Sequence, residues 1–288
     1  MSSYELVTAD IERLPHRSVY GPVKRFKRRL LRTLGRWHRA DYDVHLVFEQ
    51  DHPVYKKITF NDAATAARVT RNLQRFGPSQ HLPQWRHTRG RQLWVEFVDG
   101  QPYDRMSCIE IDAIARCFTE FARRGSRLVP LEQTGYGAQH ESNLVYLHRR
   151  GLIDSALIEA LRAKSADLRP SHLRIGFDYR DPIAPNLVQR ADSGAFCAID
   201  IKNWHADTLV GEGLAKTTDR WLDPASRDRV LAHMSDCGLG DIAETFEFLE
   251  TYERCARICR SVQIETAALG RIKKRGIKSA RLAAMVDR

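Results

Sequence analysis

The pattern of apolar and polar positions predicts two strands in the first part of the chain. Residues 43–50 (DVHLVFEQ) are rich in β-branched and aromatic side chains, and residues 52–60 (HPVYKKITF) alternate between apolar and polar positions. The stretch from Gln50 to Pro53 has the composition of a turn. We therefore expect a β-hairpin here.

A helix and a further strand follow this hairpin. Residues 61–76 have helical character, with Asn61 or Asp62 as the N-cap and a Gly-Pro pair directly after the last turn. Residues 91–100 (RQLWVEFVDG) have strand composition and end in an Asp-Gly pair. This order of strands, helix and strand is typical of a small β-rich lobe.

Helices dominate the remainder of the chain. Residues 108–124 are amphipathic, residues 153–167 form another helix, and residues 211–288 are mostly helical. Residues 126–151 are irregular and polar, and we interpret them as an insertion. Short apolar segments predict three strands in the middle of this region, at residues 172–177, 186–190 and 195–201.

A basic helix is predicted upstream of the hairpin, at residues 22–39 (PVKRFKRRLLRTLGRWHR). Apolar side chains recur there at helical spacing, and eight Lys or Arg residues fill the rest of the surface. Two interpretations stay open: a helix packed on the protein with its basic face in water, or one lying on an anionic membrane surface. Nucleic acid is a third possible contact of this segment.

Composition narrows the class of protein. The chain has 288 residues, of which 43% are hydrophobic and 28% charged, so it can bury a sizeable core. A net charge of +10 favours acidic partners such as nucleotides, phosphorylated sugars, anionic lipid or nucleic acid. No helix-turn-helix, zinc-finger or RNP pattern occurs, so we do not expect nucleic acid. Without an apolar signal-like segment, we expect a cytoplasmic protein.

The segment YRDPIAPNLV at 179–188 carries the candidate chemistry. It resembles the catalytic loop of protein kinases and of aminoglycoside phosphotransferase-like enzymes, which reads His or Tyr, then R-D-x-x-x-x-N and two apolar residues. The resemblance implies that Asp181 is the catalytic base and that Asn186 helps to hold magnesium. Asp178 stays open as the base in another register, but the loop would then be longer than usual, so we prefer Asp181.

A second acidic residue extends this resemblance. Asp200 ends an apolar strand segment nineteen residues after Asp181, and a turn at 192–194 precedes that segment. The metal-binding aspartate of the family follows the catalytic loop at about this distance, across a β-hairpin. The resemblance therefore implies that Asp200 binds Mg²⁺. Ile201 and Lys202 stand where many members of the family have Phe-Gly.

Two upstream segments resemble the nucleotide-binding parts of the same family. Residues 93–100 (LWVEFVDG) resemble the strand and hinge whose backbone binds adenine. This resemblance implies that Glu96, Phe97 and Val98 frame the base. Val54-Tyr55-Lys56-Lys57-Ile58 resembles the strand whose lysine contacts the α- and β-phosphates. We select Lys56 because it shares a strand face with the apolar residue two positions earlier, and Lys57 stays the alternative.

The resemblance covers about residues 40–215 and implies an α+β, bilobal protein kinase-like fold. We expect a basic N-terminal extension at 1–40, an N-lobe at 41–104 and a C-lobe at 105–288. The implied activity is that of an ATP- and Mg²⁺-dependent phosphotransferase. Its acceptor would be a hydroxyl of a sugar, a lipid-linked sugar or another small molecule.

The resemblance also suggests where the protein acts, and the departures from the family motifs leave two alternative functions open. Kinases of lipopolysaccharide core sugars resemble this fold and work at the inner face of the membrane, a location that the basic segment 22–39 suits. A protein Ser/Thr kinase and a non-catalytic pseudokinase that binds a partner stay open. The sequence has no glycine-rich loop pattern, helix 61–76 has no glutamate to pair with the lysine, and Tyr179 replaces the usual histidine.

Overall fold

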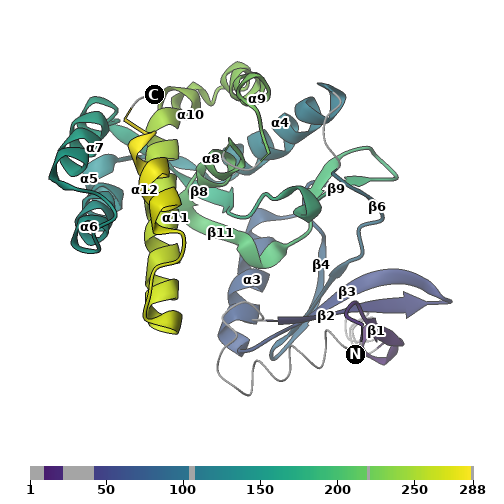
Figure 1. The fold of residues 1–288 in the computed structure, drawn as a ribbon. Coiled ribbons are helices and arrows are strands. Elements are labelled where there is room, and N and C mark those ends of the chain that lie inside the picture. The colour runs from purple at the N-terminus through teal and green to yellow at the C-terminus, as the bar shows by residue number, and fades with distance from the viewer. Residues whose placement is uncertain (1–9, 22–41, 104–107, 219–220, 287–288) are drawn as a thin grey trace. The chain divides into compact units, whose positions relative to one another are not determined.

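The computed structural model describes residues 10–21, 42–103, 108–218 and 221–286, and the chain divides into two compact units (Figure 1). The first unit comprises Met1–Asp104 and Pro185–Trp204, and the second comprises Arg105–Ala184 and His205–Arg288. Residues 185–204 thus cluster with the first unit, although the sequence interpretation had placed them in the C-lobe. The predicted basic helix at 22–39 lies outside the described residues.

The first unit contains an antiparallel sheet in the order β1-β2-β3-β5-β4. Its strands are β1 (His16–Ser18), β2 (Tyr42–Glu49), β3 (His52–Phe60), β4 (Trp85–Arg89) and β5 (Gln92–Glu96). The predicted hairpin is confirmed: Glu49 pairs with His52, and the two turn residues Gln50 and Asp51 both have positive φ, at 46° and 66°. That conformation matches the twist of the flanking strands.

Helix α3 (Ala63–Phe76) packs one apolar face against this sheet and confirms the predicted helix. Asp62 is the N-cap, and its side chain accepts a hydrogen bond from the Thr65 amide at 2.6 Å. Gly77 ends the helix with φ at 82°, a conformation that glycine adopts without strain. The buried face consists of Ala66, Val69, Thr70, Leu73 and Phe76.

A second sheet in the first unit has the order β10-β9-β6. Strands β9 (Leu187–Arg190) and β10 (Phe196–Ala198) form the hairpin that the sequence predicts, and β6 (Gly100–Pro102) pairs with β9. A Cβ at Gly100 would lie 1.9 Å from the Gln189 carbonyl oxygen, so only glycine permits this approach. The pairing joins the residues after the predicted hinge, residues 96–98, to the hairpin that precedes Asp200.

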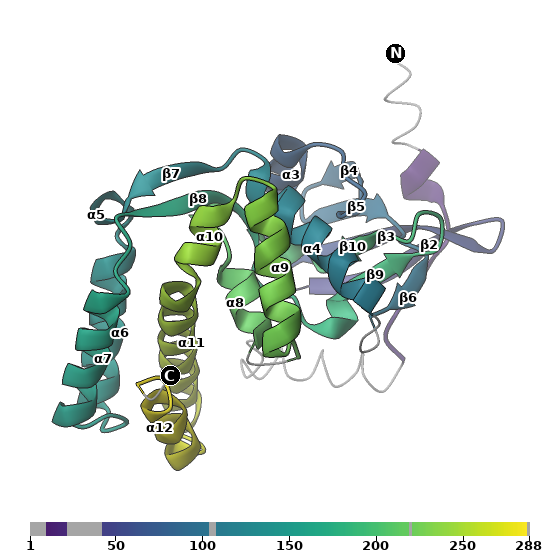
Figure 2. The same cartoon turned by 90° about the horizontal axis from the view of Figure 1, so that it is seen from above.

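The second unit is mostly helical (Figure 2) and contains a three-stranded sheet in the order β11-β8-β7. The strands are β7 (Arg127–Pro130), β8 (His172–Tyr179) and β11 (Trp204–Leu209), and β7 pairs antiparallel with β8. The helices are α4 (Cys108–Arg123), α5 (Leu131–Thr134), α6 (Tyr136–Arg149), α7 (Ser155–Asp167), α8 (Glu212–Thr218), α9 (Pro224–Asp236), α10 (Gly240–Glu244), α11 (Phe246–Leu269) and α12 (Arg275–Ala283). Within the described ranges, each helix is too short or too polar to span a lipid bilayer.

The prediction that residues 126–151 are irregular was wrong, because they form β7, α5 and α6. Helix α6 buries Leu144 and Leu147 completely in an apolar cluster shared with α7, α11 and α12. Its buried stripe also contains polar side chains, His140 and Asn143, which conceal the helical periodicity in the sequence. Strand β11 was not predicted either, because its sequence WHADTL has little alternation.

Candidate functional site

The first unit contains a cavity of about 310 Å³ that brings together six residues singled out from the sequence. They come from β3, from the end of β5 with the residues after it, and from the segments before β9 and after β10. The six are Lys56, Glu96, Phe97, Val98, Asn186 and Asp200.

Lys56 reaches this cavity and Lys57 does not. The Lys56 ammonium donates a hydrogen bond to the Ile199 carbonyl at 3.0 Å, directly before Asp200. Burial lowers the pKa of Lys56, and the negative charge of Asp200 opposes that shift. Lys57, on the opposite face of β3, places its Nζ 4.9 Å from the centre of the Trp94 ring. The pleat of the strand therefore separates the two candidates.

The Asp200 carboxylate has donors at both oxygens. The Tyr42 hydroxyl is 3.5 Å from Oδ1, and the Asn203 side-chain amide donates to Oδ2 at 2.9 Å. The Lys202 ammonium is 3.8 Å from Oδ2. An anionic carboxylate is thus held at the cavity wall by neutral and positively charged groups.

Asn186 and Asp200 offer the hard oxygen donors that Mg²⁺ prefers. Within the described ranges, no group of three or more His, Cys, Asp or Glu residues could hold a metal ion by itself. Magnesium in nucleotide sites is commonly bound through one or two protein oxygens together with phosphate oxygens. The donor set therefore fits magnesium that arrives with a nucleotide rather than an ion caged by protein alone.

Arg190 anchors the hinge to the β9–β10 hairpin. Its guanidinium donates two hydrogen bonds to the Glu96 carboxylate, at 2.7 and 3.0 Å, and one to the Gln80 carbonyl at 2.7 Å. Burial opposes ionisation of Glu96, but the bonds from Arg190 and from the Gln84 amide hold its pKa below the ordinary value. Sequence reasoning missed Arg190, since a single charge at a strand end carries no motif.

The Glu96 side chain is therefore committed to the protein, and the two residues that follow it, Phe97 and Val98, line the cavity. The Phe97 amide donates to the Val54 carbonyl at 3.1 Å, which fixes the hinge against β3. No backbone acceptor for the Val98 amide occurs among the described residues. The hinge thus contributes Phe97 and Val98 to the cavity lining, and the Val98 amide is its backbone donor for a ligand.

In the second unit, Asp178 is buried and both of its carboxylate oxygens are occupied. They accept hydrogen bonds from the Gly211 and Gly213 amides, each at 2.9 Å. Burial and the nearby Glu212 charge raise the pKa of Asp178 to about 7, while Arg180 and the two amides oppose that shift. A side chain enclosed in this way joins β8 to the start of α8 and has no free face for a substrate.

The backbone that leads to Asp181 is held by the start of α8. The Lys216 ammonium donates to the Arg180 carbonyl at 2.8 Å, and the Arg180 guanidinium pairs with the buried Glu212 at 2.8 Å. A Cβ at Gly213 would lie 1.9 Å from the Tyr179 carbonyl oxygen, so this close approach requires glycine. Asp181 itself is half-buried and lies directly after this clamped segment.

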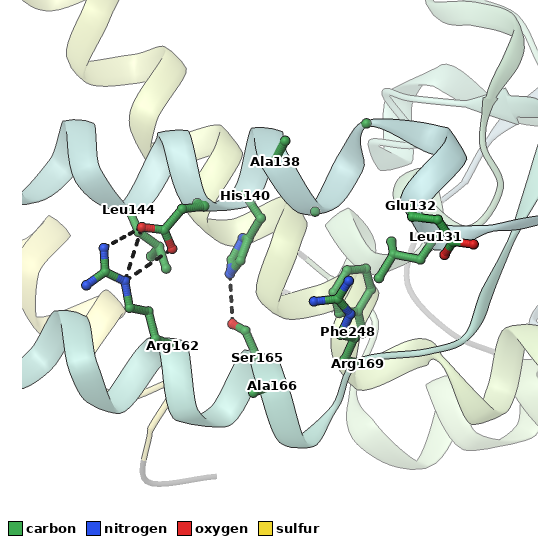
Figure 3. A pocket seen from close by; sticks show the side chains of 13 residues that line it. Leu131, Glu132, Ala138, His140, Leu144, Arg162, Ser165, Ala166, Arg169 and Phe248 are labelled. Carbon is green, nitrogen blue, oxygen red and sulfur yellow. Dashed lines mark hydrogen bonds and ion pairs between the residues drawn. The ribbon is translucent and has the colours of Figure 1, made fainter.

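A larger cavity of about 490 Å³ lies between α6 and α7 in the second unit, and none of the predicted site residues lines it (Figure 3). Ser165 donates to the Leu161 carbonyl at 2.7 Å, so its oxygen accepts from His140 Nε2 at 2.8 Å. Burial lowers the pKa of His140 to about 4, which keeps the imidazole neutral near pH 7. Glu141 and Arg162 form an ion pair at the rim. The pKa of His140 is therefore too low for the His140–Ser165 pair to provide a general base near neutral pH.

Comparison with known proteins identifies the fold. No family model and no curated protein matches the sequence. Solved structures do match: macrolide 2'-phosphotransferase MphH from Brachybacterium faecium has a TM-score of 0.58 and 15% identity over 96% of this chain and 97% of its own. APH(2")-IIa in its streptomycin–ATP ternary complex has a TM-score of 0.56 and 15% identity, over 99% of this chain and 95% of its own. An ethanolamine kinase from Plasmodium vivax has a TM-score of 0.58 and 9% identity, over 99% of this chain and 85% of its own.

At these identities the likeness shows the fold alone. The chain has the same fold as these phosphotransferase and kinase structures, in divergent form. The predicted α+β kinase-like fold is therefore confirmed.

Replacing Arg190 with Met should weaken the first unit more than removal of an exposed pair. Arg190→Met leaves the Glu96 carboxylate without its main partner. We expect a loss of about 2 kcal/mol in the free energy of unfolding, below the range for fully buried pairs because the Glu96 side chain is 23% exposed. Urea denaturation measures it. Arg89→Met removes another Arg–Glu pair, with Arg89 72% exposed, and should cost less than about 1 kcal/mol. Equal losses would contradict the anchoring role of Arg190.

The pKa of Asp178 predicts a pH-dependent stability. Because this pKa is raised from 3.8 to about 7, the folded protein binds the proton more tightly than the unfolded chain does. The resulting stabilisation is complete at acidic pH and is lost as the pH rises towards 7. The unfolding free energy of the wild type minus that of Asp178→Asn should therefore fall across this window, by at most ~1.4 kcal/mol per pH unit.

Urea denaturation at pH 4.5, 5.5, 6.5 and 7.5 tests this, with exposed Asp236→Asn as the matched control. The difference for the control variant should stay flat. A flat difference for Asp178→Asn as well would show that the Asp178 carboxyl does not titrate in this window.

Proposed function

We propose that this protein is an ATP-dependent phosphotransferase that transfers the γ-phosphoryl group to a hydroxyl of a small molecule. The observation that carries the proposal is the single cavity in which Lys56, Asn186 and Asp200 meet the hinge residues. A lysine, a carboxylate, an amide oxygen and a hinge segment are the parts that a kinase-like fold uses to hold a nucleotide. The fold of the chain supports the same reading.

Each residue has a distinct role in this proposal. Residues 96–98 frame the adenine, and Lys56 binds the α- and β-phosphates. Asp200 and Asn186 hold Mg²⁺, which neutralises charge on the phosphates during transfer. Asp181 orients the acceptor hydroxyl and takes its proton as the oxygen attacks the γ-phosphorus, and ADP leaves.

Asp181 is a better candidate for the base than Asp178. Asp178 is 3% exposed, and both its oxygens accept backbone amides. Asp181 is more exposed, and the peptide units before it are fixed by Lys216 and Gly213. A fixed approach to the reacting hydroxyl is what general-base catalysis requires.

The proposed acceptor is a small-molecule alcohol, such as a sugar or lipid-linked sugar. The similar structures are named for phosphotransfer to aminoglycosides or macrolides and for an ethanolamine kinase, and these names favour small molecules over a protein Ser/Thr substrate. The composition of residues 22–39 supports a cytoplasmic protein that contacts the inner membrane surface, a proposal that rests on sequence alone.

A non-catalytic pseudokinase is the second candidate. The observation that favours it is the Lys202 ammonium beside Asp200, together with the absence of an acidic residue in α3 that could pair with Lys56. Such a protein would use the same cavity to bind a nucleotide or would leave it unused.

Activity measurements with matched variants test the enzyme proposal. ADP release is followed with ATP, Mg²⁺ and a panel of aminoglycosides, macrolides, amino alcohols and sugars. Asp200→Asn and Asp181→Asn should each lower kcat by about 10²-fold or more, because one removes a metal ligand and the other the base. Asp192→Asn, an exposed aspartate in the β9–β10 turn, should retain activity.

Two outcomes would contradict the proposal. Equal rates in the wild type and Asp200→Asn would assign any turnover to a contaminant. A wild type that gains no thermal stability from Mg²⁺–ATP and releases no ADP with any acceptor would remove the nucleotide site altogether. Stabilisation by Mg²⁺–ATP without turnover would instead favour the pseudokinase.

A further inference from the structure

We infer that Lys202 is a second phosphate-binding cation of the nucleotide cavity, acting beside Lys56. The inference rests on the proposed function, because it assigns a contact to the nucleotide of that same site. It adds a residue that the kinase-like motifs do not mark, at the position where many relatives of this fold have the glycine of Phe-Gly.

Two contacts place the Lys202 ammonium beside residues that line the cavity. Its Nζ is 3.8 Å from Asp200 Oδ2 and 4.3 Å from the centre of the Tyr42 ring. Both Asp200 and Tyr42 line the cavity, and the Tyr42 hydroxyl is itself 3.5 Å from Asp200 Oδ1. A cation held by a carboxylate and an aromatic face is oriented before any ligand arrives.

Helix α3 supports the short 3₁₀ turn, Ile201–Asn203, that carries this lysine. The Lys202 carbonyl accepts a hydrogen bond from the Arg68 guanidinium at 3.4 Å, and the Trp204 carbonyl accepts one from the Asn72 side chain at 3.1 Å. Within the turn, the Asn203 amide donates to the Asp200 carbonyl at 3.1 Å. The backbone of Lys202 is therefore fixed relative to Asp200, and its position there is a property of the fold.

The charge of a nucleotide calls for a second cation at this place. Among the described residues that line the cavity, Lys56 is the only basic one. ATP bound to one Mg²⁺ still carries about two negative charges at neutral pH, which a partly buried site must offset. Glu96 contributes little net charge because Arg190 pairs with it, so among the described residues Lys202 adds a second positive charge beside the cavity.

The sequence between β1 and β2 explains why a side chain takes this role. Kinases cover the phosphates with a glycine-rich loop, G-x-G-x-x-G, whose backbone comes close to the phosphate oxygens. Residues 19–41 contain only two glycines, Gly21 and Gly35, and no such pattern. A lysine that follows the metal-binding aspartate replaces part of that backbone cradle with a charged donor.

Nucleotide binding with and without phosphates tests the inference. Affinities for Mg²⁺–ATP and for adenosine are measured by calorimetry on the wild type, Lys202→Met and Lys202→Arg. Lys202→Met should weaken Mg²⁺–ATP binding by about 10-fold to 100-fold, as expected for a lost charged hydrogen bond, and leave adenosine binding unchanged. Lys202→Arg should retain most of the Mg²⁺–ATP affinity.

Lys57→Met is the matched control. Like Lys202→Met, it removes a lysine whose ammonium lies over an aromatic ring. The ring here is Trp94, on the face of β3 opposite to Lys56, so this variant should alter neither affinity. Thermal unfolding of the ligand-free variants shows whether each one folds.

Three results would overturn the inference. Equal losses for adenosine and Mg²⁺–ATP in Lys202→Met would assign the lysine a purely structural role. Tighter Mg²⁺–ATP binding in that variant would show that the lysine competes with the metal for Asp200. A wild type that binds neither ligand would remove the proposed nucleotide site itself, a failure that is distinct because it precedes any effect of the variants.

Discussion

The bidentate pair between Arg190 and Glu96 is the constraint on which the candidate nucleotide site depends. It joins the β9–β10 hairpin to the end of the hinge strand, and the hairpin is flanked by Asn186 on one side and Asp200 on the other. Residues nearly a hundred positions apart are thereby fixed around one cavity, with Lys56 at 3.0 Å from the carbonyl that precedes Asp200. A buried arginine with two further carbonyl acceptors can hold this geometry because its planar fork satisfies several partners at once.

In the second unit, backbone contacts rather than an ion pair hold the segment that leads to Asp181. Asp178 receives two amides from the start of α8, Gly213 packs without a side chain against the Tyr179 carbonyl, and Lys216 binds the carbonyl of Arg180. These contacts fix the backbone before Asp181. They explain why two aspartates three residues apart differ in environment. Asp178 is buried and joins β8 to α8, whereas Asp181 is half-buried and follows the fixed segment.

The sequence predicts those features that depend on local pattern. Alternation located the β2–β3 hairpin, and the opposite faces of neighbouring strand positions selected Lys56 over Lys57. The hairpin before Asp200 followed from two apolar segments around a turn. Long-range polar pairing has no local signature, so the Arg190–Glu96 pair could not be predicted. Helix α6 was missed because it buries His140 and Asn143, which a pattern of apolar positions reads as surface.

We propose that Asn186 and Asp200 hold a magnesium–nucleotide complex on which Asp181 acts as the base. A crystal structure with Mg²⁺ and a non-hydrolysable ATP analogue tests it most directly. We expect a metal ion within about 2.1 Å of oxygens of Asp200 and Asn186, with the Asp181 carboxylate facing the γ-phosphate. A nucleotide bound elsewhere, or an Asp181 carboxylate turned away from the terminal phosphate, would contradict it.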